Sequence, residues 1–179
     1  MPKPKATSSG RVVCFVGISG KPGANGTIKP LSEETLSGKI ISEVEAKLRV
    51  VSECSVFVRD NLVQTPPLTD GKLRYPTQKE MKSEWGSFER RLVKKKSNVI
   101  ILLGRLVAEF FKEMRNIRMV ACPSADGRLL KWAGVDENGL LVLAVAHPSY
   151  VGVYARKRIG DYAEIILSAV QSSLKEATV

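Results

Sequence analysis

The chain has 179 residues, of which 44% are hydrophobic and 26% charged, a balance that is typical of a folded globular protein and excludes a disordered one. The 28 Lys and Arg residues against 18 Asp and Glu residues give a formal net charge of +10, which favours an anionic partner, nucleic acid ahead of an acidic membrane surface. No apolar run reaches the roughly 18 residues that a membrane-spanning helix needs, so we expect no such helix.

The chain begins with a polar segment and a short β-rich run. Residues 1–10 contain two lysines and small polar residues but no apolar core, so we expect a flexible basic arm and not a secretory signal. Residues 11–17 are apolar and β-branched, which predicts a buried parallel strand. A loop rich in glycine and proline follows over 18–30.

A helix, a strand and a second helix are predicted next. Apolar residues recur at helical spacing over 36–48, with Ser32 as the expected N-cap. Residues 54–58 predict a second strand, which leads through a proline-rich loop to a polar helix. Thr77 and Glu80 have the spacing of a capping box, so we expect that helix to begin there.

The second half of the chain continues the alternation of strands and helices. Its predicted elements are a strand over 98–103, a helix over 105–114, a short apolar run over 117–121, a strand pair over 129–133 and 140–146 around a turn at 136–139, and a closing helix whose buried face runs from Ile159 to Ser173. Together the elements predict an α/β fold: a three-layer α/β/α sandwich with a central, mostly parallel four-stranded sheet, in a single domain over 11–179.

This architecture predicts where a ligand binds. Open α/β sheets bind ligands at the carboxyl ends of their strands. The loop after the first strand, Asn61 after the second and His147 after the last are all expected at that edge. Their shared edge is therefore the candidate site.

Several other classes of site are excluded by the motifs. The glycine-rich loop matches neither the P-loop spacing nor GxGxxG, so it can equally be a simple turn, and no GxSxG is present. Three dispersed cysteines and one histidine do not suit a disulfide framework, a structural zinc site or a multi-histidine metal site. We interpret Cys14 and Cys54 as small core residues, expect no metal or cofactor, and take a reducing, cytoplasmic compartment as the simplest interpretation.

His147 is the most distinctive single residue. A lone histidine is more often structural than catalytic, but this one ends a predicted buried strand before Pro148 and Ser149. The following segment, through Arg158, combines aromatic residues with three consecutive cations, as suits a loop that enters a duplex while its cations hold the backbone. The alternative is an ordinary helix start with a solvated basic face. The candidate DNA-binding residues are Ser149, Tyr150, Tyr154, Arg156, Lys157, Arg158 and, in the first loop, Lys21.

The positive charge is unevenly distributed. Residues 71–120 carry 13 Lys and Arg against 5 Asp and Glu, which accounts for +8 of the net charge. These cations can form a merely solvated face. Taken with the basic arm and residues 156–158, a distributed phosphate-binding surface is the better interpretation.

Four stretches of the chain resemble the uracil-DNA glycosylase superfamily, and the resemblance runs from Arg11 to about Leu174. They are VGISGKPGANGTIKPLSEETLSG, similar to the first motif of that family; DNLVQTPPLTDGKLRYPT, similar to the segment that holds its base-reading asparagine; NVIILLGRLVAEFF, close to a strand–glycine–helix segment of the microbial branches; and AHPSY, which matches its HPS motif. HPS alone is a weak signal, whereas four segments in the right order are more specific.

The resemblance implies a monomeric base-flipping N-glycosylase that acts on single- or double-stranded DNA. It implies that Asn61 reads the edge of a uracil-type base and that His147 donates a hydrogen bond to the charge that develops on the departing base. Further base-binding candidates are Gly17, Ile18, Ser19 and Leu31. Asn25 and Asp60 are candidates for orienting the water.

The sequence departs from the family pattern in three respects. Ile18 and Ser19 stand where active members often carry an acidic residue or asparagine, Leu31 replaces a stacking aromatic residue, and the cysteines of the iron–sulfur branches are absent. Two alternatives therefore remain open beside a glycosylase for uracil or a related base. One is a DNA-binding module of the same fold with weak or no catalysis, and the other is an enzyme of free nucleosides or nucleotides.

Overall fold

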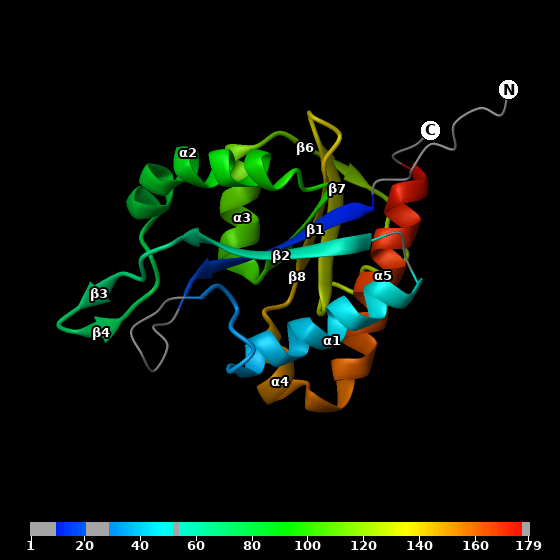
Figure 1. Cartoon of the computed structure of the whole chain (residues 1–179), viewed down its shortest axis with the longest axis horizontal. Helices are drawn as coiled ribbons and strands as arrows, with labels where there is room; N and C mark the ends of the chain where they lie inside the picture. The colour runs from blue at the N-terminus through cyan, green and yellow to red at the C-terminus, as the bar shows by residue number, and fades with distance from the viewer. Residues whose placement is uncertain (1–9, 21–28, 52–53, 177–179) are drawn as a thin grey trace, which may run out of the picture.

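The computed structural model describes residues 10–20, 29–51 and 54–176 (Figure 1). The expected arm over 1–10 lies almost wholly outside the described residues, and so do Lys21 and Asn25. No helix within these ranges is long and apolar enough to cross a membrane.

A six-stranded sheet forms the centre of the fold, in the order β2-β1-β5-β8-β7-β6. Its strands are β1 (Arg11–Ser19), β2 (Cys54–Val63), β5 (Val99–Leu103), β6 (Ile117–Val120), β7 (Leu130–Asp136) and β8 (Leu141–Val145). The first four in that order pair in parallel, and β7 and β6 extend them antiparallel. The α/β class and the mostly parallel sheet are thus confirmed, but the predicted count of four strands is wrong. The hairpin partner β7 and the partly exposed strand β6 join the parallel block at its edge, instead of standing apart from it.

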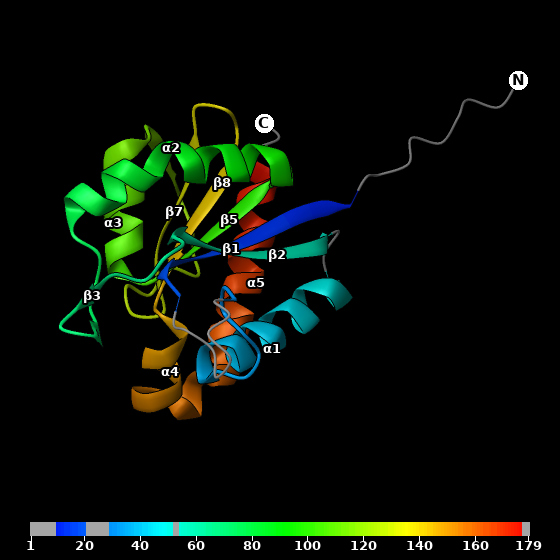
Figure 2. The ribbon, with the colours of Figure 1, turned by 60° about the vertical axis from the view of Figure 1, so that its left-hand side comes forward.

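Helices cover both faces of this sheet. They are α1 (Leu36–Val51), α2 (Gln78–Lys95), α3 (Arg105–Met114), α4 (Pro148–Tyr154) and α5 (Ile159–Glu176). Figures 1 and 2 show α2 and α3 on one side of the sheet and α1, α4 and α5 on the other, as the predicted sandwich requires.

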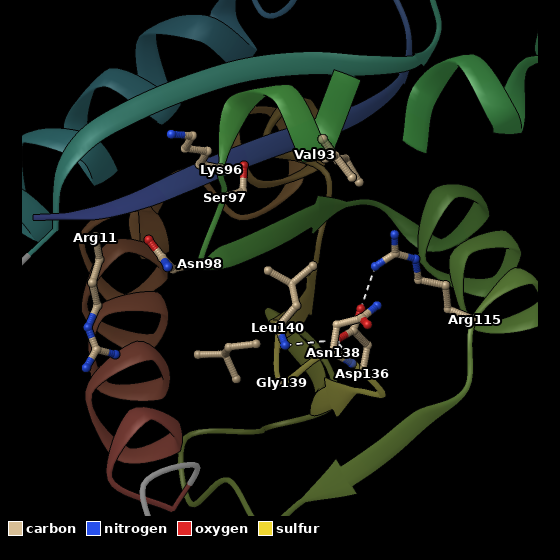
Figure 3. Close-up of a pocket in the computed structure, with 12 residues that line it drawn as sticks. Arg11, Val93, Lys96, Ser97, Asn98, Arg115, Asp136, Asn138, Gly139 and Leu140 are labelled. Atoms are coloured by element: carbon tan, nitrogen blue, oxygen red, sulfur yellow. Dashed lines mark hydrogen bonds and ion pairs between the residues drawn. The ribbon is translucent and has the colours of Figure 1, made fainter. Parts of the chain in front are cut away.

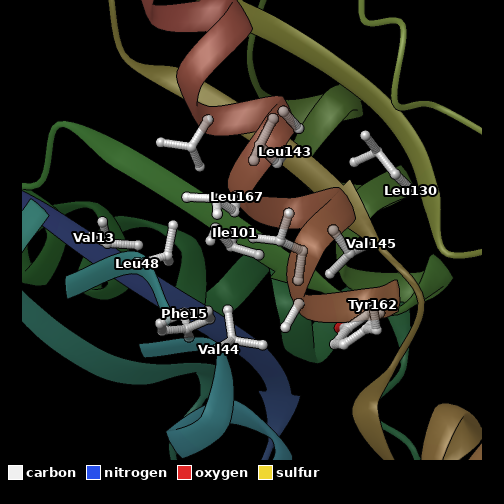
Figure 4. Packing of buried hydrophobic residues seen from close by; sticks show 14 of the residues in the cluster. Val13, Phe15, Val44, Leu48, Ile101, Leu130, Leu143, Val145, Tyr162 and Leu167 are labelled. Atoms are coloured by element: carbon white, nitrogen blue, oxygen red, sulfur yellow. The ribbon is translucent and has the colours of Figure 1, made fainter. Parts of the chain in front are cut away.

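Alternation along β1 divides the core into these two layers. Val13 and Phe15 pack with α1 and α5, where Tyr162 is fully buried (Figure 4), whereas Cys14 and Val16 pack with α2 and α3. Burial raises the pKa of the Cys14 thiol to about 12, so the thiol stays protonated, and both Cys14 and Cys54 are core residues as predicted.

The ends of the helices follow local sequence signals in one case and depart from them in another. Thr77 and Glu80 form the predicted capping box at the start of α2. The expected N-cap at Ser32 is wrong, because the Thr35 hydroxyl accepts the Gly38 N–H at 3.0 Å directly before α1 begins.

Two segments are more ordered than predicted. The proline-rich loop contains a small hairpin of β3 (Leu68–Thr69) and β4 (Lys72–Leu73). The expected loop over 150–158 is helical instead, because α4 is followed by a 3₁₀ turn at Arg156–Arg158 that continues into α5. The helix start that the alternative interpretation expects is therefore present in this segment.

Candidate functional site

The carboxyl edge of the parallel strands brings the two principal candidates to one side of the sheet. Asn61 pairs with Gly17 near the end of β1, and Val145 at the end of β8 pairs with Leu103 of β5. Asn61 lies within β2 and not after it, because that strand continues to Val63. His147 follows β8, three strand spacings from Asn61, or about 14 Å across the sheet.

Asn61 is held tightly at this edge, with only 2% of its surface exposed. In the orientation that satisfies its hydrogen bonds, its amide oxygen accepts the Gly20 N–H at 3.0 Å and its amide nitrogen donates to the Asp60 carbonyl oxygen at 3.3 Å. A Cβ atom added at Gly17 would lie 2.7 Å from a terminal atom of the same amide. The glycine of the first strand therefore makes room for the asparagine of the second.

A cavity of about 240 Å³ opens beside this amide, lined by Pro30, Asn61, Gln64 and Thr65. Gln64 and Thr65 are exposed and directly follow the last residue of β2. The sequence reasoning missed both of them. Their position after a strand that ends at the ligand-binding edge is the signal that could have found them.

Leu31 lies next to Gly17 and has an uncommon backbone conformation. Its φ is +50°, and its Cδ2 atom lies 3.8 Å from the position of a Cβ at Gly17. Arg59 of β2 donates to the Leu31 carbonyl oxygen at 2.6 Å and is itself paired with Glu45 at 2.9 Å. The structure thus brings Leu31 to Asn61 through their shared neighbour Gly17.

The other two base-binding candidates of the first loop differ from Leu31. Ile18 is 9% exposed and packs among the residues under α2 and α3, which is a core position and not a pocket wall. Ser19 is half-buried and pairs with Val63 at the end of the strand. A base-binding role for Ile18 is therefore not supported by its position.

His147 begins α4 and acts as its N-cap. Its Nδ1 atom accepts the Ser149 N–H at 3.2 Å and lies 2.6 Å from the Ser149 hydroxyl oxygen. Because a backbone N–H can only donate, Nδ1 carries the lone pair, and in the neutral ring the proton is on Nε2. Gly104, at a φ of +99°, lies so close that an added Cβ would be 3.2 Å from the His147 Cβ. In the neutral ring these contacts favour the tautomer that carries its proton on Nε2.

Tyr162 of α5 secures the backbone just before His147. Its hydroxyl is fully buried and donates to the Ala146 carbonyl oxygen at 2.7 Å, and burial raises its pKa. This contact ties the end of β8 to the layer of α1 and α5.

Asp60 faces α2, and both of its carboxylate oxygens have partners. Its carboxylate, 1% exposed, accepts the Asn61 N–H at 2.8 Å and pairs with Arg91 at 3.1 Å and with Lys95. This arrangement fits a structural ion cluster, so the expectation that Asp60 orients water is not retained.

The outer surface near His147 carries the DNA-binding candidates. Tyr150 and Tyr154 are 51% and 78% exposed, and their rings lie 5.4 Å apart. Arg156 and Lys157 are exposed. Arg158 is half-buried, and its ion pairs with aspartates on either side, led by the hydrogen bond to Asp161, raise its pKa. Figures 1 and 2 show that α4 and the β3–β4 hairpin both lie beyond the carboxyl edge.

A larger cavity of about 550 Å³ lies at the opposite, amino edge of the sheet (Figure 3). Asp136 lines it, and its carboxylate accepts the Asn138 and Leu140 N–H groups at 2.9 and 2.8 Å and pairs with Arg115. These bonds close the β7–β8 turn. In the part of the chain that the structure describes, no three His, Cys, Asp or Glu side chains gather as a metal site.

Comparison with known proteins identifies the family. The model of the uracil DNA glycosylase superfamily matches residues 29–171, which is more than half of the chain. The chain belongs to the uracil DNA glycosylase superfamily. Its α/β sandwich is accordingly that of a uracil DNA glycosylase superfamily domain, and the matched range contains Asn61 and His147 but begins after Gly17. No curated protein matches the chain.

Proposed function

We propose that this superfamily domain excises uracil or a related modified base from DNA, by flipping the base out of the stack and hydrolysing its N-glycosidic bond. The observation that carries the proposal is the buried amide of Asn61 beside a cavity at the carboxyl edge of the sheet. A buried amide with one acceptor and two N–H donors can recognise an edge that presents one donor and one acceptor, as uracil does.

Base recognition would replace a hydrogen bond that the Asn61 amide now makes to the protein. Its amide oxygen now accepts the Gly20 N–H, so base binding would exchange that bond for one from the base. Gln64 and Thr65 line the same cavity and supply further polar groups. A Cβ at Gly17 would crowd the same amide, so the glycine leaves room for it.

His147 would act on the departing base. Cleavage of the glycosidic bond leaves negative charge on the base, and a fixed Nε2–H donor stabilises that charge as it develops. The Ser149 contacts to Nδ1 favour this tautomer. Water then supplies the hydroxyl to the sugar carbon and its proton to the base.

Grip on DNA would come from the surface around α4. Tyr150 and Tyr154 offer exposed aromatic rings, and Arg156 and Lys157 offer cations for phosphates. The half-buried Arg158 pairs with two aspartates and contributes less. We further propose that residues 11–179 act as one domain and as a monomer, with the segment 1–10 as a basic arm.

A second candidate function is a DNA-binding module that holds a flipped base without cleaving it. It is favoured by the engagement of Asp60, the carboxylate next to Asn61, with two cations. The retention of a fixed donor tautomer at His147 favours catalysis over this alternative.

Oligonucleotides that carry uracil, hydroxymethyluracil, hypoxanthine or xanthine distinguish the two. Treatment with the protein and then with alkali cleaves the strand wherever a base has been removed. We expect cleavage by the wild type and by the control Asn138→Ala, an exposed asparagine at the far edge, and much slower cleavage by Asn61→Ala. Binding without cleavage of any of the four would refute the enzyme and support the binding module.

A further inference from the structure

The backbone of Asn61 is held by side chains on both of its polar groups. Its N–H donates to the Asp60 carboxylate at 2.8 Å, and its carbonyl oxygen accepts from Arg91 Nη2 at 2.8 Å. The Nε atom of the same guanidinium lies 3.1 Å from the Asp60 carboxylate. One residue of α2 therefore closes a ring of contacts around the peptide that carries the candidate base-reading amide.

These side-chain contacts serve the backbone groups of Asn61 in the way that a neighbouring strand would. Among the residues that the structure describes, β2 is the outermost strand of the sheet on this side, and none of them forms a strand along its outer edge. Asp60 and Asn61 are nonetheless 1% and 2% exposed, and buried polar groups need partners. Arg91 and Asp60 supply them at Asn61, which also lines the cavity.

Arg91 itself is well supported. Its guanidinium carbon lies 5.6 Å from the centre of the Phe88 ring, one turn earlier on α2, and its side chain is 21% exposed. Lys95, another turn later, pairs with the same Asp60 carboxylate but makes no contact with Asn61 among the described interactions. The two cations thus share one carboxylate while only one of them reaches the asparagine.

We propose that Arg91 is a positioning residue for base recognition: through the Asn61 carbonyl oxygen and the Asp60 carboxylate, it fixes where the Asn61 amide stands. This inference rests on the proposed function. It assigns a specificity role to a cation of the basic helix α2, which composition alone would assign to phosphate contact. A planar fork can bind a carbonyl and a carboxylate at once, which an ammonium on a flexible stem does not do in the same geometry.

The pair Arg91→Lys and Lys95→Met separates positioning from charge. Arg91→Lys keeps the positive charge near Asp60 and loses the fork, whereas Lys95→Met removes a charge from Asp60 and leaves the Asn61 carbonyl contact in place. We expect Arg91→Lys to lower kcat/KM for uracil excision on the order of 10- to 100-fold and to reduce the preference for uracil over other bases, since a misplacement near 1 Å has effects of this size. We expect Lys95→Met to lower the melting temperature with base preference unchanged.

A double-mutant cycle makes the test specific for Asn61. If Arg91 acts through this residue, Arg91→Lys has no further effect on base preference in an Asn61→Ala background. Equal losses of preference in Arg91→Lys and Lys95→Met, or an Arg91→Lys effect that persists without the asparagine, would overturn the proposal. Should Arg91→Lys fail to fold, Arg91→Gln serves in its place, because its amide still donates to one acceptor.

Hydrogen exchange tests the positioning without any activity. The Asn61 N–H should exchange faster in Arg91→Lys than in wild type, and in Lys95→Met less so. Unchanged exchange in Arg91→Lys would contradict the clamp itself, whatever the activity. A wild type that excises no base would instead refute the proposed function while the exchange result still decides the role of Arg91.

Discussion

Gly17→Ala is the substitution whose effect the structure defines best. The added Cβ would stand 2.7 Å from a terminal atom of the Asn61 amide, whereas ordinary contact begins at 3.4 Å. The amide must therefore move by at least about 0.7 Å, because the other neighbours of that Cβ lie at 3.8 Å or beyond and do not clash. The φ of Gly17 is not in the left-handed region, so alanine adds no backbone strain.

The size of the effect follows from this displacement. Overpacking at one buried site costs about 1–3 kcal/mol of stability, which leaves a typical domain folded. A catalytic or recognition group displaced by this amount loses on the order of 10- to 100-fold in rate. We therefore expect single-turnover excision of uracil to fall by that factor, with a melting temperature reduced by several degrees.

Gly160→Ala provides the matched control, because nothing lies within 4 Å of a Cβ at Gly160. It should leave both excision and melting temperature close to wild type. A folded Gly17→Ala protein with wild-type excision would refute the reasoning that the Asn61 amide is the group that reads the base.

Three further predictions follow from other parts of the molecule. Ser149→Ala removes the hydroxyl 2.6 Å from His147 Nδ1 and should slow single-turnover excision on the order of 10-fold. The control Ser172→Ala, in the last turns of α5, should leave the rate unchanged. Equal rates in the two variants would show that the Ser149 hydroxyl does not orient the ring. The hydrogen bond from Arg74 lowers the pKa of Glu80 from its ordinary 4.5 to about 2, so the stabilising contribution of Glu80 is present above about pH 4.5 and is lost as the pH falls toward 2. The melting temperature should therefore fall more steeply with pH over that range in wild type than in Glu80→Gln. Parallel plots of melting temperature against pH would contradict this. Replacing Arg156 and Lys157 by alanine should reduce the slope of log binding constant against log salt by about 2, measured by fluorescence anisotropy with labelled DNA, and an unchanged slope would remove these cations from the interface.

Features set by local sequence could be predicted. The start of α2 follows from Thr77 and Glu80 three residues apart, and α3 begins and ends where the helical pattern of 105–114 does. The hairpin of β7 and β8 likewise follows from the turn signal at 136–139. In each case the groups that interact are close in the chain.

Features set by register and by packing between distant segments could not. The contact between Gly17 and Asn61 depends on which residues of β1 and β2 pair, and apolar runs do not specify that register. The sequence likewise does not show that α2 packs beside Asp60. Asp60 was a candidate for orienting the water, but Arg91 and Lys95 of α2 pair with its carboxylate instead. The predicted four-stranded sheet leaves out the partly exposed strand β6, because its partner in the sheet is the hairpin strand β7.

The proposed excision is tested most directly by following the base itself. Uracil-containing DNA, single- and double-stranded, is incubated with the wild type and with His147→Ala, and free uracil is quantified by mass spectrometry. The account predicts that the wild type releases uracil and that His147→Ala, still bound to the DNA, releases it on the order of 10²- to 10³-fold more slowly. Equal release by both proteins would contradict the role of His147, and no release by the wild type would contradict the proposed function.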